Sequence, residues 1–255
     1  MIKRVKFILK SLFLVLFMIN TFGMSNTFAV LKKPGMKKIE GNWVNLYYEK
    51  EKKAAEDVFK LADEKTEAIA RKLGFSEKQN VNVYVYDSQA DMQSKVRGLQ
   101  NMTEKLPWYI GDNLGTNVVL TSPAHPGSAH DYESVKNAVL HEIVHAYVSV
   151  LNPKISLWLN EGMALHLSNG APFCRAFLKF VEIPRYEEIC TNDHIIFSEI
   201  DGYTLAHTYV EYLEKTYGWE KVLELVKTED YNKVFGKSHR EIYDEWASFL
   251  RNYPR

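Results

Sequence analysis

The spacing of hydrophobic and polar residues predicts both strands and helices in the first half of the chain. Trp43 to Tyr48 and Val81 to Tyr86 are short runs rich in β-branched and aromatic residues, which is typical of strands. Between them, Glu51 to Leu73 has apolar residues at helical spacing, and Gly74 follows directly. A further helix is predicted from Asp87 to Arg97. The first half is therefore expected to contain a sheet with helices between its strands.

The middle of the chain combines a strand with a long apolar helix. The segment TNVVLTS, within Gly111 to Ser122, predicts a strand. Tyr132 to Leu151 then has apolar residues at helical spacing without an internal Gly or Pro, so we expect a largely buried helix. Asp131 stands at its N-cap position and Pro153 follows its end. After a short turn, a second helix is predicted to begin near Ser156.

The remainder of the chain has the pattern of amphipathic helices. One is predicted to begin at Gly202 and continue through Tyr217, and others follow from Trp219 to the C-terminus. We expect them to close the core and one wall of a cleft. The pattern indicates an α+β fold with a single domain over residues 30–255, in which a sheet-containing part covers about 43–151 and a helical part about 152–255.

The predicted helix Tyr132 to Leu151 contains an H-E-x-x-H motif. His141 and His145 are displaced by about 6 Å along the helix axis and project from the same face, so two imidazoles can bind one metal ion. Glu142 is offset by about 100° from His141, which leaves it beside the metal as a general base. A catalytic zinc ion takes three protein ligands, and Glu161 on the next helix is the candidate for the third.

The segments HEIVH and WLNEGMA together resemble the gluzincin metallopeptidases. The similarity is closest to the small bacterial peptidases of the MA-like group, which are related to the catalytic domain of zinc aminopeptidases. It covers roughly Trp43 to the C-terminus, and its specific residues lie between about Gly115 and Tyr209. The resemblance implies a zincin-like fold, in which a small mixed sheet has its edge strand over the motif helix.

The same resemblance assigns roles to four residues. It implies one Zn²⁺ per chain, bound by His141, His145 and Glu161, with Glu142 activating the water. In some gluzincins an acidic residue soon after the glutamate ligand orients a ligand histidine. This chain has no such acid there, so the partner that orients the histidines is not identified by the sequence.

In the gluzincins, the strand before the motif helix is an edge strand that binds the substrate backbone by strand addition. Asn117 to Thr121 is the matching segment, and it makes Asn117, Val118 and Val119 the expected substrate-backbone residues. An ordinary interior strand is the alternative.

A peptidase of this kind also needs a hydrogen-bond donor for the oxyanion formed when water attacks the carbonyl. In related enzymes a tyrosine downstream of the glutamate ligand often provides it, so Tyr203 is the first candidate and His207 and Tyr209 are alternates. The chain has 15 tyrosines, so a packing role for Tyr203 remains open. Surface or core roles are expected for the other histidines considered, His125, His130, His166 and His194.

The start of the chain has the pattern of an export signal. A basic stretch without an acid (MIKRVKFILK) precedes a short apolar run and the residues SNTFA, which predicts a signal peptide over residues 1–29. A retained N-terminal anchor is the alternative. Removing the four basic residues of this segment leaves 28 basic against 32 acidic groups, which gives no electrostatic footprint for nucleic acid.

The two cysteines, Cys174 and Cys190, are 16 positions apart. An exported protein permits a disulfide between them, and two separate thiols are the alternative.

These features predict a secreted or cell-envelope zinc metallopeptidase that hydrolyses peptide bonds in a peptide or protein substrate. We expect no nucleic-acid partner and no stable membrane insertion after signal cleavage. The alternative is a secreted, zinc-stabilised binding protein with a peptidase-like fold and no catalysis. A third interpretation, an intracellular regulatory H-E-x-x-H peptidase, conflicts with the export signal.

Overall fold

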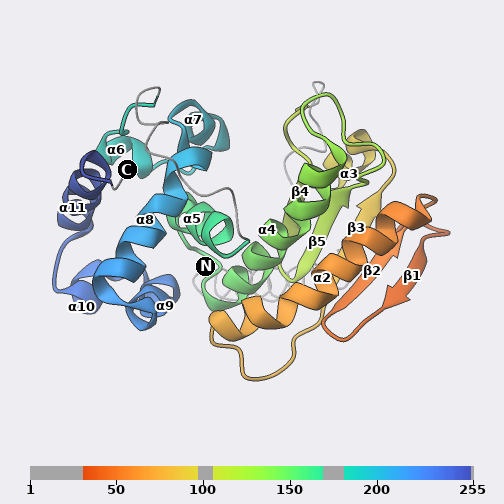
Figure 1. Cartoon of the computed structure of the whole chain (residues 1–255), viewed down its shortest axis with the longest axis horizontal. Helices are drawn as coiled ribbons and strands as arrows, with labels where there is room; N and C mark the ends of the chain where they lie inside the picture. The colour runs from red at the N-terminus through yellow and green to blue at the C-terminus, as the bar shows by residue number, and fades with distance from the viewer. Residues whose placement is uncertain (1–30, 97–105, 169–180, 254–255) are drawn as a thin grey trace, which may run out of the picture.

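A computed structural model of the chain describes residues 31–96, 106–168 and 181–253 (Figure 1). The predicted signal segment over residues 1–29 and Cys174 lie outside these residues. Cys190 is described and is exposed, and the structure does not test whether the two cysteines form a disulfide or stay separate thiols.

A small mixed sheet forms one side of the molecule (Figure 1). Its strands lie in the order β1-β2-β3-β5-β4. Their bounds are β1 Lys37–Glu40, β2 Val44–Tyr48, β3 Val81–Tyr86, β4 Gly111–Leu114 and β5 Asn117–Thr121. The three central strands β2, β3 and β5 are parallel, whereas β1 and β4 pair with their neighbours in the antiparallel direction. The α+β class is confirmed.

Helices cover both faces of this sheet because its strands are apolar on both faces. α2 (Lys52–Lys72) and α4 (Tyr132–Leu151) lie side by side on one face (Figure 1). Val83 of β3 points into the main core on that side, whereas its neighbour Tyr84 belongs to a second buried cluster on the other face. Met92 of α3 (Gln89–Lys95) is part of that second cluster.

The helical part of the chain packs beside the end of α4 (Figure 1). Its helices are α5 Leu157–Leu167, α6 Tyr186–Ile189, α7 His194–Glu199, α8 Gly202–Tyr217, α9 Trp219–Thr228, α10 Tyr231–Phe235 and α11 His239–Arg251. Trp158 and Trp246 lie at its centre, and the indole N–H of Trp246 donates to Thr208 Oγ1 at 2.9 Å. Within the described residues, no helix combines the length and apolar character needed to span a membrane.

The predicted motif helix is confirmed at both ends. α4 covers Tyr132–Leu151, and the Asp131 side chain accepts a hydrogen bond from the backbone N–H of Ser134 at 2.7 Å, as an N-cap residue does. Ser156 likewise occupies the N-cap position of α5. The helix bounded by Gly202 and Tyr217 is also confirmed, as α8.

The strand expected at the edge of the sheet is an interior strand, and this prediction was wrong. In β5, Val118 pairs with Val83 of β3 on one side and with Asn113 of β4 on the other. The backbone groups of Asn117, Val118 and Val119 are thus engaged within the sheet and cannot bind a substrate backbone. The reason is a hairpin: Gly115, with φ +61°, allows the chain to reverse, so that β4 covers β5. β4 is the edge strand on this side.

α5 and α8 approach each other closely at Gly162. A Cβ atom built on Gly162 would lie 2.6 Å from the backbone oxygen of Ala206 and 3.0 Å from Cγ2 of Val210. The backbone atom cannot move without shifting α8, so the absence of a side chain at Gly162 sets the separation of the two helices.

We predict that Gly162→Ala lowers the free energy of unfolding by about 1–3 kcal/mol, the usual cost of inserting a methyl group into a close-packed core. Helix propensity alone predicts the opposite sign, because alanine stabilises a helix interior by about 1 kcal/mol relative to glycine. Urea denaturation of both proteins separates the two expectations. A variant with a higher free energy of unfolding would show that α8 can move away from α5 without destabilising the protein.

Candidate metal centre

The two motif histidines lie on one face of α4, as their spacing predicts. Their rings meet edge to face with centroids 4.6 Å apart, and the Nε2 atoms of His141 and His145 are 3.0 Å apart. His145 is only 6% exposed, whereas the side chain of His141 retains 19% exposure. The pair thus points two ring nitrogens at one location, and solvent reaches that location on the His141 side.

α5 brings the third group. Oε2 of Glu161 lies 3.2 Å from Nε2 of His141, and Oε1 lies 3.5 Å from Nε2 of His145. Glu161 is 4% exposed. One ligand atom from each of the three residues falls within 4.8 Å of the others, so the group could hold a metal ion. Two imidazoles and one carboxylate suit a divalent transition metal.

Asn160 orients His145. Nδ1 of His145 lies 3.0 Å from Oδ1 of Asn160, so the ring N–H donates to the amide oxygen and Nε2 faces His141 and Glu161. Asn160 precedes Glu161 in the N-E-G segment. α5 therefore supplies both the candidate ligand Glu161 and the residue that orients the candidate ligand His145. The sequence did not identify this partner, because some gluzincins use an acidic residue after the glutamate ligand and Asn160 precedes it.

The electrostatics of the group favour a bound cation. Burial alone would lower the pKa of His145, but the adjacent Glu161 carboxylate outweighs it and raises that pKa to about 9. Burial opposes the charge on Glu161, and the neighbouring histidines nevertheless hold its pKa well below the usual range. The buried carboxylate thus requires a positive charge between the side chains, which a proton or a metal ion can provide.

Glu142 lies beside this group, between α4 and the edge strand. It is 8% exposed, and burial raises its pKa to about 8, with a further contribution from the Asp112 and Glu161 carboxylates. A Cβ atom built on Gly111 of β4 would lie 3.0 Å from Cγ and Oε1 of Glu142. A side chain at position 111 would press on Glu142, so Gly111 leaves room for this carboxyl group beside β4.

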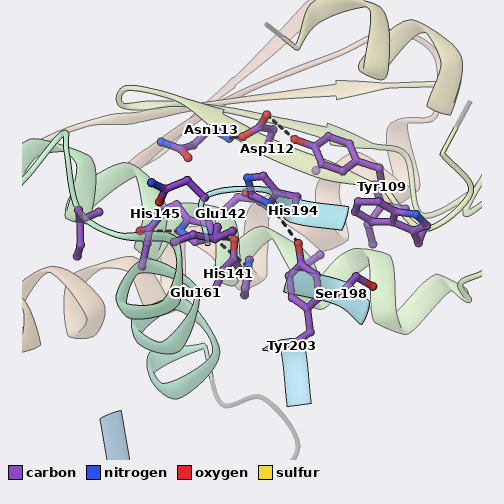
Figure 2. Close-up of a pocket in the computed structure, with 18 of the residues that line it drawn as sticks. Tyr109, Asp112, Asn113, His141, Glu142, His145, Glu161, His194, Ser198 and Tyr203 are labelled. Carbon is purple, nitrogen blue, oxygen red and sulfur yellow. Dashed lines mark hydrogen bonds and ion pairs between the residues drawn. The ribbon is translucent and has the colours of Figure 1, made fainter. Parts of the chain in front are cut away.

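The candidate metal group opens into a cavity of about 580 Å³. β4, α4, α5, α7 and α8 contribute residues to its walls. Tyr203 and His194 line this cavity from α8 and α7 (Figure 2), and Nδ1 of His194 lies 3.3 Å from the Tyr203 hydroxyl. Burial raises the pKa of Tyr203 well above its usual value, so its hydroxyl remains a neutral donor.

Of the three candidate oxyanion donors, the structure brings Tyr203 to the cavity. Tyr209 is fully buried in the helical core, where its hydroxyl donates to that of Tyr231 at 3.2 Å. His207 is not among the cavity-lining residues. The two alternates, His207 and Tyr209, are therefore not positioned at the candidate metal group.

His130, His194 and Asp112 line the cavity, although surface or core roles were expected for the two histidines and Asp112 was not selected from the sequence. His194 belongs to the short helix α7 and carries no motif around it, so only the folded chain reveals its position. Asp112 lies on β4, which the sequence analysis did not separate from β5. His166 forms a hydrogen bond with Glu214 at 2.7 Å and does not line this cavity.

No protein-family model matches the chain, and no curated protein matches it significantly. The inference of function therefore depends on the geometry and chemistry of this cavity.

The position of Asn160 leads to a prediction about metal affinity. Asn160→Ala removes the acceptor that fixes His145, and we expect the affinity for a divalent metal ion to fall about 10–100-fold. Asn160→Asp keeps an acceptor in place and should retain most of the affinity. Competition against a chromophoric chelator measures both variants. Equal affinity in the alanine variant and the unmodified protein would exclude an orienting role for Asn160.

Proposed function

We propose that this protein is an exported, zinc-dependent metallopeptidase that hydrolyses peptide bonds. The observation that carries the proposal is the convergence of His141, His145 and the buried Glu161 carboxylate beside a fourth group, Glu142, that is not needed as a ligand. All four face an open cavity large enough for part of a peptide. The predicted export signal supports action outside the cytoplasm.

The donor set supports zinc as the metal. Two histidines and one glutamate are a known ligand set of catalytic zinc, which keeps a further position for water or substrate. When bound there, zinc supplies a Lewis acid that polarises the scissile carbonyl and lowers the pKa of water. Within this proposal, Asn160 holds His145 in the tautomer that presents Nε2 to the metal.

Glu142 is the proposed general base. Its carboxyl pKa of about 8 shows how strongly its surroundings favour the protonated form, and a nearby cation would lower that pKa toward the working pH. Glu142 accepts a proton from the attacking water and then donates it to the leaving amine.

Tyr203 is the proposed oxyanion donor, and His194 is the residue that positions it. A neutral tyrosine hydroxyl can donate one hydrogen bond to the developing negative charge on the carbonyl oxygen. The 3.3 Å contact with Nδ1 of His194 restricts the direction in which the hydroxyl points. Both side chains enter the cavity from the helical part, opposite the strand β4 (Figure 2).

The edge strand β4 is the proposed support for the substrate backbone. It takes the role that the sequence analysis gave to Asn117, Val118 and Val119. Gly111, Asp112 and Asn113 line the cavity, and the outer edge of β4 has no partner strand within the described sheet. An extended peptide could pair with this edge and place a carbonyl near Glu142.

The central test combines metal analysis with cleavage of a mixed peptide library by the purified mature protein. We predict one zinc per chain and chelator-sensitive cleavage. Glu142→Gln should keep the zinc and lose about 10²–10⁴-fold in kcat, because it removes proton transfer and leaves the ligands intact.

His145→Ala serves as the matched control for Glu142→Gln, because it should lose both the zinc and the activity. Near-normal turnover in Glu142→Gln would show that another group is the base. Stoichiometric zinc without cleavage in the unmodified protein would favour the binding-protein alternative.

A second prediction concerns Tyr203. Tyr203→Phe removes only the hydroxyl, and we expect kcat to fall about 10²–10³-fold while zinc content and KM stay close to those of the unmodified protein. Tyr209→Phe, which removes a hydroxyl from the helical core, is the control and should leave kcat unchanged. Steady-state kinetics on one cleaved peptide distinguish the two. Equal kcat values in Tyr203→Phe and the unmodified protein would show that Tyr203 has a packing role and does not donate to the oxyanion.

A further inference from the structure

Asp112 is a carboxyl group in the cavity that the proposed mechanism does not use. Its Oδ2 accepts a hydrogen bond from the Tyr109 hydroxyl at 2.6 Å, and its Oδ1 accepts one from the backbone N–H of Asn113 at 2.6 Å. Burial raises the pKa of Asp112, and these two hydrogen bonds act in the opposite direction. The side chain is thus held in one place and still lines the cavity.

The cavity is lined by more carboxyl groups than the candidate metal ligands and the proposed base account for. Three carboxyl groups line it, those of Asp112, Glu142 and Glu161, whereas no lysine or arginine is found among the described residues of its walls. Glu161 is a candidate metal ligand and Glu142 is the proposed base, so Asp112 is the carboxyl group that neither role uses. Its two hydrogen bonds favour the charged form, which attracts a positively charged group.

The pleat of β4 determines where that group would lie. The side-chain position of Gly111 points at Glu142, so the next residue, Asp112, points to the other face of the strand. Asp112 pairs with Val119, whose side chain belongs to the buried cluster on the face away from α4. In Figure 2 its carboxylate accordingly points toward Tyr109 and away from the candidate metal ligands.

Asp112 is therefore suited to contact a substrate side chain and not the reacting atoms. Residues directly opposite each other in an antiparallel pair have Cβ atoms about 4.5–5.5 Å apart on the same face. A lysine or arginine opposite Asp112 could reach its carboxylate. Trp108, 36% exposed and in edge contact with Tyr109, also lines the cavity and offers an aromatic surface for a cation.

We propose that Asp112 selects peptides with a lysine or arginine side chain at the residue that pairs with it on β4. This inference rests on the proposed function for its strand-addition step. The chemical class of the substrate is then a cationic peptide. Its lysine or arginine lies opposite Asp112, next to the substrate residue that lies opposite Gly111 and faces Glu142.

The test measures peptide binding in the Glu142→Gln protein loaded with zinc, so that it does not depend on turnover. The probes are fluorescent peptides, acetylated and amidated at their ends, in which one lysine is moved through successive positions and then replaced by glutamine or glutamate. We expect one position at which lysine binds roughly fivefold tighter than glutamine, as for a strong cross-strand ion pair, and glutamate binds weakest. The preference should decrease with added salt.

Adding Asp112→Asn should abolish that preference, because asparagine keeps an oxygen for the Tyr109 hydroxyl and loses the charge. The matched control is Asp244→Asn, which removes an exposed carboxylate from α11 that does not line the cavity. It should leave the preference unchanged. Thermal unfolding of each variant shows whether the fold is retained, and Asp112→Glu provides a second, charge-preserving variant that should keep lysine selectivity.

Equal binding of the lysine, glutamine and glutamate peptides would overturn the inference, as would a preference that survives in Asp112→Asn or an absence of binding by every peptide. A preference found only in peptides with a free N-terminus would assign the cation to the terminal amine and contradict the side-chain assignment. The proposed peptidase function is judged separately, by cleavage of the same peptides in the unmodified protein.

Discussion

The burial of the Glu161 carboxylate between two imidazoles is the constraint on which the cavity depends. A carboxylate with 4% exposure is stable only beside a positive charge and hydrogen-bond donors. α4 supplies these because its histidines are one turn apart, and α5 can approach it because both helices are apolar around the motif. Gly162 then allows α8 to pack against the far side of α5. The charged cluster thus joins α4 to α5, and α8 packs against α5 in turn.

The two halves of the chain contribute different kinds of group to the cavity. The sheet side brings backbone groups and the Asp112 carboxylate through β4, while the helical side brings a phenol and an imidazole from Tyr203 and His194. α4 and α5 lie between them and hold the candidate metal ligands. The arrangement separates groups that can bind an extended chain from groups that can stabilise charge on a single oxygen atom, as the proposed reaction requires.

Local patterns in the sequence predicted the elements that carry the candidate metal group. The motif helix was predicted at its observed bounds because Asp131 caps it and no Gly or Pro interrupts its apolar spacing. Tyr203 was selected through the resemblance to the gluzincins, and it lies in the cavity. By contrast, the interior position of β5 depends on a hairpin at Gly115, and a short polar strand such as GDNL has no clear strand pattern. Asn160 and His194 were missed because their roles depend on contacts between elements.

The main hydrophobic cluster is continuous from the strands to the last helix, since Val83 of β3 and Trp246 of α11 belong to the same set of buried residues. The walls of the cavity therefore belong to one core, although they come from both halves of the chain. A core of this kind makes folding and assembly of the cavity a single cooperative event. Neither half carries the full set of cavity groups, so a cut between α4 and α5 would separate the histidine pair from its carboxylate and expose apolar surface on both fragments.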